Sequence, residues 1–529
     1  AMPSFLEMSL ITLCGGVLGV MFMVPLRRAL IVEEHGKLPF PEGTACADVL
    51  FAGEKGGKKS GLVFSGLGIS AGYKFLTDGV KLFPSEVDYS SGFYRGAGFG
   101  VDVLPALLGV GYICGIRIAS YMFAGGILAW LVLMPAIALF GADSVIAPAT
   151  ELIKDMSTWD IWGKYVRYIG AGAVAAGGII SLFKSLPVIW KTFKLAILGY
   201  GRHKSGEKDN TLRTERDMPM WIVAVGILGA ALLLFVIPSV PISFAGILLI
   251  LVFGFFFATV SSRMVGLVGS SNNPVSGMAI ATLIIATAFL KLLGYDGYAG
   301  MTSAICIGTV ICIVAAMAGD TSQDLKTGYI VGATPVKQQI GELIGTLAAG
   351  LAIGGVLYLL NSAWGYGSTE LPAPQATLMK LVVEGVMGGS LPWTMVLCGI
   401  GIAIVIEVLG LPVLPVAIGL YLPIHLSAPI FIGALVRWYI SGHGKEKPDN
   451  GENMENGEAI ENGTLFSSGL IAGEGLVGIL LAVFALISYK GRTIADIIDM
   501  GNVLGYAGSI IFFATLIFIM VRSSLKKET

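Results

Sequence analysis

The chain has 529 residues, of which 55% are hydrophobic and only 13% are charged, and its mean hydropathy is +0.81. This composition excludes a water-soluble globular protein, because no core of this size could bury so much apolar surface. The formal net charge of −1 gives no reason to expect a nucleic-acid partner. Apolar runs of about 20 residues are typical of membrane-spanning helices and not of barrel strands. We therefore predict an all-α, polytopic membrane bundle with about 14 spans or half-spans, broken or re-entrant helices and a possible internal repeat.

The predicted spans follow from apolar windows, taken in chain order. They are 5–25, 61–82, 102–118, 120–140, 163–183, 219–237, 242–260, 277–293, 298–318, 339–360, 391–410, 413–440, 465–487 and 504–522. The segment 376–389 is too short for a simple crossing, so we expect a re-entrant or half helix there. The sequence predicts a single transmembrane domain over 1–529.

Charges in the loops predict the orientation, because Lys and Arg accumulate on the cytoplasmic side. The connection 26–60 and the polar loop 188–218 are rich in Lys and Arg and are predicted to be internal. The loop 141–160 carries four acidic residues against one lysine and is predicted to be external. The loop 441–463 is rich in Asn, Gly and Glu, so we expect a flexible linker.

The first unusual motif is PFPEGTACADVL at 39–50, where two prolines and a carboxylate interrupt an apolar region. Proline is compatible with the first turn of a helix and ends the segment before it. We expect a short helix whose positive end favours the charged form of Glu42, with Pro41, Gly43 and Thr44 forming a substrate-binding segment. The alternative is an ordinary helix end at a charged cytoplasmic loop.

A second broken stretch, GLVGSSNNPVSGMAIATLI, occupies 266–284. Asn273 can cap a helix that begins at Pro274, and the free N–H groups of such a helix bind anions. We predict that backbone groups near Ser276 and Gly277 bind a substrate carboxylate, and we include Asn272 in this site. The alternative is an ordinary cap at the membrane interface. Paired Gly/Pro-interrupted segments in two parts of a transporter indicate a binding site near the midplane.

The third motif is AGDTSQDLKTGYIVGATPVKQQ at 318–339. If the preceding helix continues, Gln323 and Thr327 share one face, as do Asp320 and Asp324, and Lys326 can pair with either carboxylate. From residue content alone a solvated cytoplasmic cap is the favoured interpretation.

Ionisable residues inside apolar windows are costly unless they are paired or hydrated. Glu407, Asp102, Glu384 and Arg117 are such residues. Glu407 is the deepest and is a candidate proton carrier, because desolvation favours the neutral acid, although a structural ion pair explains it equally well. The six cysteines and four histidines are scattered, so we expect no metal site built into the protein and no disulfide, and we single out only His425.

Enzyme chemistry has little support in the sequence. Tyr295-Asp296 and Gly319-Asp320 resemble the aspartate pair of intramembrane proteases, but Met317 stands where that motif needs glycine. A helix of 24 residues would also separate the two carboxylates by about 36 Å. The zinc motif HExxH and the serine motif GxSxG are absent.

Four segments in this order resemble the oligopeptide transporter family: KLPFPEGTACADVL, GLVGSSNNPVSGM, GDTSQDLKTGYIVGATPVKQQ and IEVLGLPVLPVAIGLYLPI, the last of which contains Tyr421. The match is closest to bacterial members and to the yellow stripe-like branch. The resemblance implies proton-coupled uptake of small peptides, or of metal bound to a peptide-like chelator. It also favours a functional role for Asp320 to Thr327. Family members usually carry further spans before the point where this chain starts.

The sequence therefore predicts a secondary transporter in the inner membrane of a bacterium. We expect substrate binding at Pro41, Glu42, Gly43, Thr44, Asn272, Asn273, Pro274, Ser276, Gly277 and Tyr421. We expect proton coupling at Glu407, Asp320 and Asp324, and a cytoplasmic gating motif at Gln323, Lys326 and Thr327. Expected partners are peptides or metal chelates, the lipid bilayer and a possible homo-oligomer, with a proton gradient and no bound cofactor. A non-transporting receptor is the remaining alternative.

Overall fold

The computed structural model describes residues 4–36, 38, 40–53, 60–90, 92–147, 149–174, 176–177, 180, 183, 212–236, 242–268, 270, 273, 275–368, 371, 373–388, 392–442, 454–489 and 492–525. Over these residues helices predominate, and eight of them are long and apolar enough to cross a membrane. Three shorter apolar helices accompany them. The prediction of an all-α, polytopic membrane protein is confirmed.

The chain divides into two compact units. Unit 1 comprises 1–56, 178–358 and 373–391, and unit 2 comprises 57–177, 359–372 and 392–529. Several predicted features lie outside the described residues. These are Pro39, Asn272, Pro274, most of the loop 188–218 and residues 443–453.

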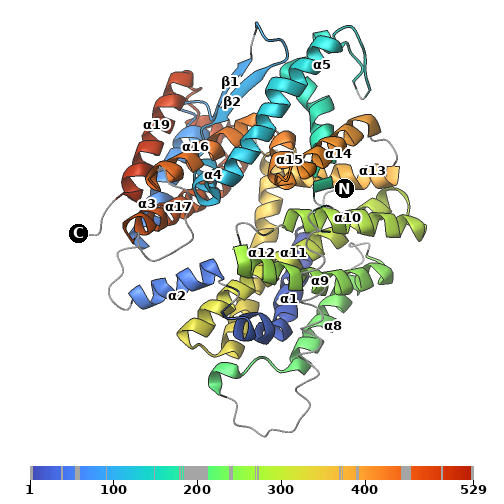
Figure 1. The fold of residues 1–529 in the computed structure, drawn as a ribbon, viewed down its shortest axis with the longest axis vertical. Helices are drawn as coiled ribbons and strands as arrows, with labels where there is room; N and C mark the ends of the chain where they lie inside the picture. The colour runs from blue at the N-terminus through green and yellow to red at the C-terminus, as the bar shows by residue number, and fades with distance from the viewer. Residues whose placement is uncertain are drawn as a thin grey trace. The chain divides into compact units, whose positions relative to one another are not determined.

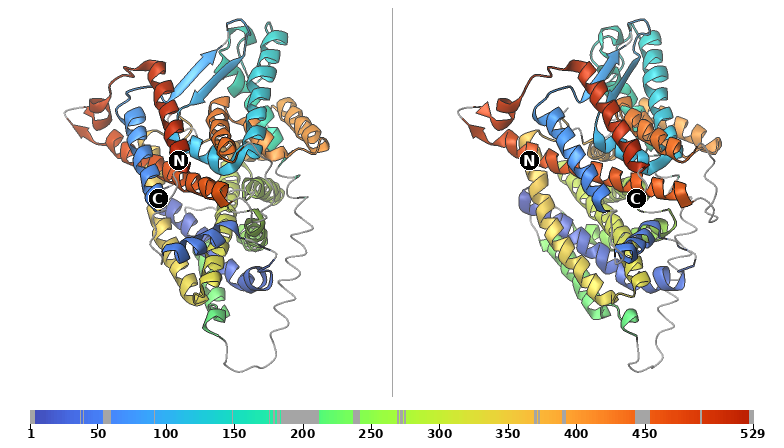
Figure 2. Two further views of the ribbon diagram at one scale, coloured as in Figure 1. Left: turned by 60° about the vertical axis from the view of Figure 1, so that its left-hand side comes forward. Right: turned by 90° about the vertical axis from the view of Figure 1, so that its left-hand side faces the viewer.

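Unit 1 is built from long helices and a few short turns. In chain order they are α1 (Phe5–Arg27), the π-helical turn η1 (Arg28–Glu33), α2 (Pro41–Gly53), the 3₁₀ turn η6 (Arg213–Glu215), α8 (Met220–Val236), α9 (Phe244–Val268), α10 (Val275–Leu292), α11 (Gly297–Val331), α12 (Pro335–Ala363, in unit 1 to Tyr358) and α13 (Pro374–Gly388). Helix α11 packs against α1, α2, α9 and α10 and is therefore the central element of this unit. Figures 1 and 2 show α1, α9 and α11 side by side.

Small residues allow these helices to approach closely. A Cβ atom at Gly19 of α1 would lie 2.6 Å from the Cβ of Met317 in α11. Next to this contact between α1 and α11, buried Phe22 packs edge to face on Phe255 of α9, with 5.5 Å between the ring centroids. Helix packing in a membrane depends on such close fits, because lipid and side chain are equally apolar.

Unit 2 contains helices and two short antiparallel hairpins. Its elements are α3 (Ser60–Lys74), η2 (Phe75–Gly79), β1 (Glu86–Ser90), β2 (Gly98–Asp102), α4 (Pro105–Ile127), η3 (Leu128–Leu133), α5 (Met134–Phe140), η4 (Ile153–Asp155), α6 (Thr158–Ile161), η5 (Trp162–Val166), α14 (Trp393–Val408), α15 (Val413–Tyr421), α16 (Ile424–Ile440), α17 (Met454–Leu486), β3 (Ser488–Tyr489), β4 (Arg492–Thr493), α18 (Ile494–Ile498) and α19 (Gly505–Ser524). Helix α4 packs on α15, α16 and α17, and α17 packs on α3.

Element boundaries in unit 2 differ from the prediction at three places. The expected spans 102–118 and 120–140 form one helical run from Pro105 to Phe140, which is interrupted only at Gly115 (φ 77°, ψ 168°). No polar loop separates them, so the helix resumes after the glycine. The expected span 413–440 is instead two helices, because the chain is extended at Leu422 before Pro423. Helix α17 begins at Met454, so the last part of the predicted linker 441–463 is helical.

The β1–β2 hairpin has no counterpart in the prediction. Its register pairs Glu86 with Asp102 and Ser90 with Gly98. Asp102, which the apolar window placed in a span, lies instead at the end of β2, before α4 begins. The window included Asp102 because the residues that follow it from Val103 onward are apolar.

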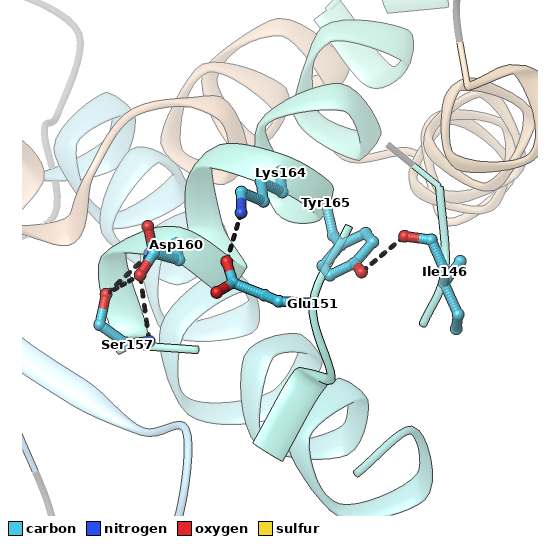
Figure 3. Close-up of polar contacts among 6 residues, drawn as sticks. All are labelled: Ile146, Glu151, Ser157, Asp160, Lys164 and Tyr165. Atoms are coloured by element: carbon cyan, nitrogen blue, oxygen red, sulfur yellow. Dashed lines mark hydrogen bonds and ion pairs between the residues drawn. The ribbon is translucent and has the colours of Figure 1, made fainter. Parts of the chain in front are cut away.

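Local polar contacts order the connection between α5 and η5. Lys164 Nζ donates a hydrogen bond to Glu151 Oε1 over 2.6 Å, and the hydroxyl of Tyr165 donates to the carbonyl of Ile146 over 2.8 Å (Figure 3). The hydroxyl and N–H of Ser157 donate to Asp160, which lowers the pKa of that carboxyl below its ordinary value. Part of the loop predicted to be external is thus fixed by its own side chains.

Candidate functional site

The chain enters α2 through a strained residue. Phe40 has φ 47°, which a bulky side chain rarely adopts, and its N–H donates to the carbonyl of Gly266 in α9 over 2.9 Å. Its ring is fully buried and lies against Gly266. Helix α2 then begins at Pro41 and ends at Gly53. The predicted short helix is therefore present, and strain of this kind is typical of functional sites.

The carboxylate of Glu42 lies in the first turn of α2 and joins three segments. It accepts hydrogen bonds from the backbone N–H of Ser270 over 2.7 Å and from the side-chain amide of Gln323 in α11. The positive end of α2 and these two groups surround the carboxyl oxygens with hydrogen-bond donors. The first and third motifs, 280 residues apart, therefore meet here.

Gly43 allows α2 to touch α11. Its N–H donates to Gln323 Oε1 over 2.7 Å, and its carbonyl accepts from Thr327 Oγ1 over 2.8 Å. A Cβ atom at this position would lie 2.4 Å from the backbone oxygen of Gln323. Thr327 also bonds to the carbonyl of Gln323, which confirms that the helix continues and that these two side chains share a face.

The second motif meets the same helices through Asn273. Its side-chain Nδ2 donates to Ser261 Oγ of α9 over 2.7 Å, and it lies beside Gly319 of α11. Its Oδ1 is buried and has no hydrogen-bond partner. The predicted cap is therefore wrong for this side chain, because its amide bonds to α9 while α10 begins at Val275. Ser276 and Gly277 lie in the first turn of α10, and their side-chain environment is outside the described residues.

Lys326 does not pair with a carboxylate as the sequence led us to expect. Its ammonium lies 2.7 Å from Nδ1 of His35, and the side chains of Asp320 and Asp324 are exposed. Asp324 accepts a hydrogen bond from Gln338 Nε2 over 2.8 Å instead. Sequence reasoning missed His35, because a histidine in a charged loop gives no signal of a partner 291 residues away.

Glu407 and Tyr421 belong to unit 2, whereas the residues above belong to unit 1. Glu407 is half-buried in the last turn of α14, and Tyr421 is buried at the end of α15. His425, at the start of α16, lies 2.9 Å from Asp88 of the hairpin through Nε2 and packs on two tryptophans.

The protease alternative does not fit the geometry. Asp296 precedes α11, and Asp320 lies within it after 23 residues of continuous helix, so the two carboxylates cannot share a water. Within the described ranges, no group of three or more His, Cys, Asp or Glu side chains is placed to hold a metal ion.

Comparisons with known proteins find relatives over most of the chain. The family model described as OPT oligopeptide transporter protein matches residues 1–485. A Haemophilus influenzae protein named "Putative oligopeptide transporter" is 34% identical over 490 residues, which cover 83% of this chain and 75% of that protein. The metal-nicotianamine transporters YSL2 and YSL3 of Arabidopsis thaliana are 24% and 25% identical, and the alignments cover 70% of this chain in both cases. These alignments span 59% and 57% of the plant proteins.

Proposed function

Because the chain belongs to the oligopeptide transporter family, we propose that it is a proton-coupled secondary transporter that takes up small oligopeptides through the inner membrane of a bacterium. Membership of a family of transporters makes transport across a membrane, and not catalysis, the activity of this multi-pass protein. Peptide substrates and proton coupling are the parts of the proposal that need experiments.

The observation that carries the proposal is the meeting of the three motifs in unit 1. Glu42, Gln323 and Asn273 come from three separate motifs. Gln323 and Asn273 each donate a hydrogen bond to α9, and Glu42 accepts one from Ser270, just after α9. A packed bundle has no structural need for a carboxylate and an unpaired amide oxygen at such a junction. Both groups are suited to an ammonium group, which every free peptide carries at its N-terminus.

The substrate site in this proposal comprises Glu42, Gly43, Thr44 and Asn273, with the first turn of α10 at Ser276 and Gly277 binding the peptide carboxylate. Pro41, Asn272, Pro274 and Tyr421 remain predicted members. Proton binding by Glu407, Asp320 or Asp324, gating by Gln323, Lys326 and Thr327, and a homo-oligomer also remain predictions.

Metal chelates are the second candidate substrate, and the plant relatives' names favour it. The bacterial relative is more similar, at 34% identity, so we place peptides first. Thermal unfolding of the purified protein should be measured with di- to hexapeptides and with ferric and nickel chelates. Stabilisation by free peptides supports the proposal, whereas stabilisation by metal-loaded ligands alone selects the chelate alternative.

Proton coupling can be tested in proteoliposomes. Peptide accumulation should rise when the external side is more acidic. The variant Glu407→Gln should lose this dependence, whereas Glu42→Gln, at the substrate site, should lose peptide uptake altogether. Undiminished gradient-driven uptake by Glu407→Gln would contradict proton binding by Glu407, and undiminished uptake by Glu42→Gln would contradict substrate binding by Glu42.

A further inference from the structure

Lys326 is a buried cation that lacks an acidic partner. Its side chain is only 1% exposed, in the last third of α11. The ammonium contacts Nδ1 of His35 at 2.7 Å and the carbonyl of Leu38 at 3.5 Å, and it lies 5.3 Å from the centre of the Phe40 ring. Tyr329 offers a second ring face at 5.8 Å. Among the residues that the structure describes, no carboxylate is paired with this ammonium.

Most charged groups on neighbouring elements have partners other than Lys326. Glu34 bonds to Arg263 over 2.8 Å, Glu42 bonds to Ser270 and Gln323, Arg27 pairs with Asp217, and Asp324 bonds to Gln338. Exposed Glu33 lies 3.8 Å from Arg28, Asp320 is exposed, and both carboxyl oxygens of Glu342 in α12 are buried without a hydrogen-bond partner among the described residues. The charge of Lys326 therefore depends on dipoles and ring faces, which compensate a buried ammonium poorly.

His35 connects this buried amine to solvent. Its side chain is exposed, in the turn that follows η1. An ammonium has donors only, so Nδ1 must accept and the imidazole must carry its proton on Nε2. A second proton on the ring would place two positive charges 2.7 Å apart, which is strongly disfavoured. The geometry therefore accommodates one excess proton on the two residues together.

We propose that Lys326 and His35 form the proton relay of this transporter on its cytoplasmic side, an inference that rests on the proton coupling proposed above. In the transfer step, the Lys326 ammonium gives one proton to Nδ1 of His35 as the bond from Nε2 to its hydrogen breaks. That second proton passes to a water molecule. The products are a neutral amine, a neutral imidazole in the other tautomer and a hydronium ion, so charge and protons balance.

The relay is joined to the substrate segment by two direct contacts. Both the Leu38 carbonyl and the Phe40 ring contact the ammonium, and the Phe40 carbonyl accepts the N–H of Thr44 over 2.9 Å. Loss of the charge weakens the attraction of Lys326 for the Leu38 carbonyl and the Phe40 ring. Because Phe40 is strained, the segment from Leu38 to Thr44 can then relax, and Glu42 and Gly43 move with it. Proton release is thereby linked to the geometry of the substrate site.

The test uses the full chain in proteoliposomes with radiolabelled trialanine as the probe. Two rates are compared: accumulation driven by an acid exterior, and exchange of internal for external trialanine at equal pH. Lys326→Arg keeps a positive charge that cannot dissociate, Lys326→Met removes it, and His35→Gln removes the exposed ring. Lys291→Met is the matched control, because Lys291 donates to the carbonyl of Val386 over 2.8 Å and is exposed.

We expect Lys326→Arg and His35→Gln to keep exchange and to lose gradient-driven accumulation, while Lys291→Met behaves like the wild type. Lys326→Met is expected to lose accumulation as well. Wild-type accumulation in both Lys326→Arg and His35→Gln would overturn the relay alone. Loss of exchange together with accumulation in both variants, with normal thermal unfolding, would also overturn it, because that result indicates a purely structural role. A wild-type protein that ignores the proton gradient would overturn the proposed coupling and the relay with it.

Discussion

Gln323 uses both ends of its amide, and this fixes which residue types suit the site. Its oxygen accepts from Gly43 N and its nitrogen donates to the carboxylate of Glu42. A carboxylate at this position would keep the first bond and turn the second into a repulsion. We expect Gln323→Glu to lower the free energy of unfolding by about 1–3 kcal/mol. Adding Glu42→Gln should restore it, because the amide and the carboxylate then exchange places.

Denaturant titration of the purified protein measures this cycle. Gln338→Glu is the control, since Gln338 faces exposed Asp324 and the same change there should cost less than about 1 kcal/mol. Equal losses at the two positions, or no recovery in the double variant, would show that the Glu42–Gln323 contact does not exist in the protein.

Gly43 is a second residue whose identity the packing dictates. A methyl group there would meet the backbone of α11 at 2.4 Å, and backbone cannot move aside as a side chain can. Gly43→Ala should therefore cost about 1–3 kcal/mol of stability and impair peptide uptake. Gly341→Ala, in open surroundings on α12, should change stability by less than about 1 kcal/mol. Thermal unfolding and peptide uptake should be measured for both variants. Wild-type stability and uptake in Gly43→Ala would contradict the close contact between α2 and α11.

At the scale of elements, the β1–β2 hairpin carries a buried acid. Asp102 is 7% exposed, its Oδ1 has no hydrogen-bond partner, and Glu86 faces it across the hairpin. Burial, helped by the charge of Glu86, raises the pKa of Asp102 to about 7 from an ordinary value of 3.8. Between these two pH values the folded state binds a proton that the unfolded state lacks. Stability from this group is therefore present at low pH and lost as the pH rises towards 7.

Asp102→Asn should remove this dependence. The stability of the variant relative to the wild type is expected to increase by up to about 1.4 kcal/mol per pH unit between pH 4 and 7 and then level off. Thermal unfolding of both proteins in detergent at several pH values provides the comparison. Asp143→Asn, whose side chain is 86% exposed, should give a difference that does not vary with pH. If the stability difference between Asp102→Asn and the wild type also did not vary with pH, Asp102 would be hydrated in the folded protein.

For the whole molecule, the charge of the loops predicts which side each one faces. Single cysteines on a cysteine-free background can test this with a membrane-impermeant maleimide on intact cells. We expect Asp143→Cys to be labelled directly and Glu215→Cys, which is also exposed, to be labelled only after permeabilisation. The reverse pattern would place the Lys326–His35 relay on the outer side and contradict its role as a cytoplasmic exit.

The sequence by itself determined the class of this protein and the segments that matter. Hydropathy alone predicts helices in a membrane, because the bilayer offers the backbone no hydrogen-bonding partners. Prolines and glycines likewise predicted the short helix at Pro41 and the break before α10, since both are local backbone effects. Local rules misplaced Asp102, however, because an apolar helix follows it directly, and they gave no sign of the hairpin.

Only the tertiary structure decided which groups meet. Glu42 with Gln323, Asn273 with Ser261 and Lys326 with His35 are contacts between different segments of the chain, and two of the three bridge more than 280 residues. The charge of Lys326 suggested a nearby carboxylate, because helical spacing reports only neighbours on the same helix. Which side chain faces it from another helix depends on how α11 packs against η1 and α2. That packing is set by many small van der Waals contacts along the helices, which no short segment of sequence contains.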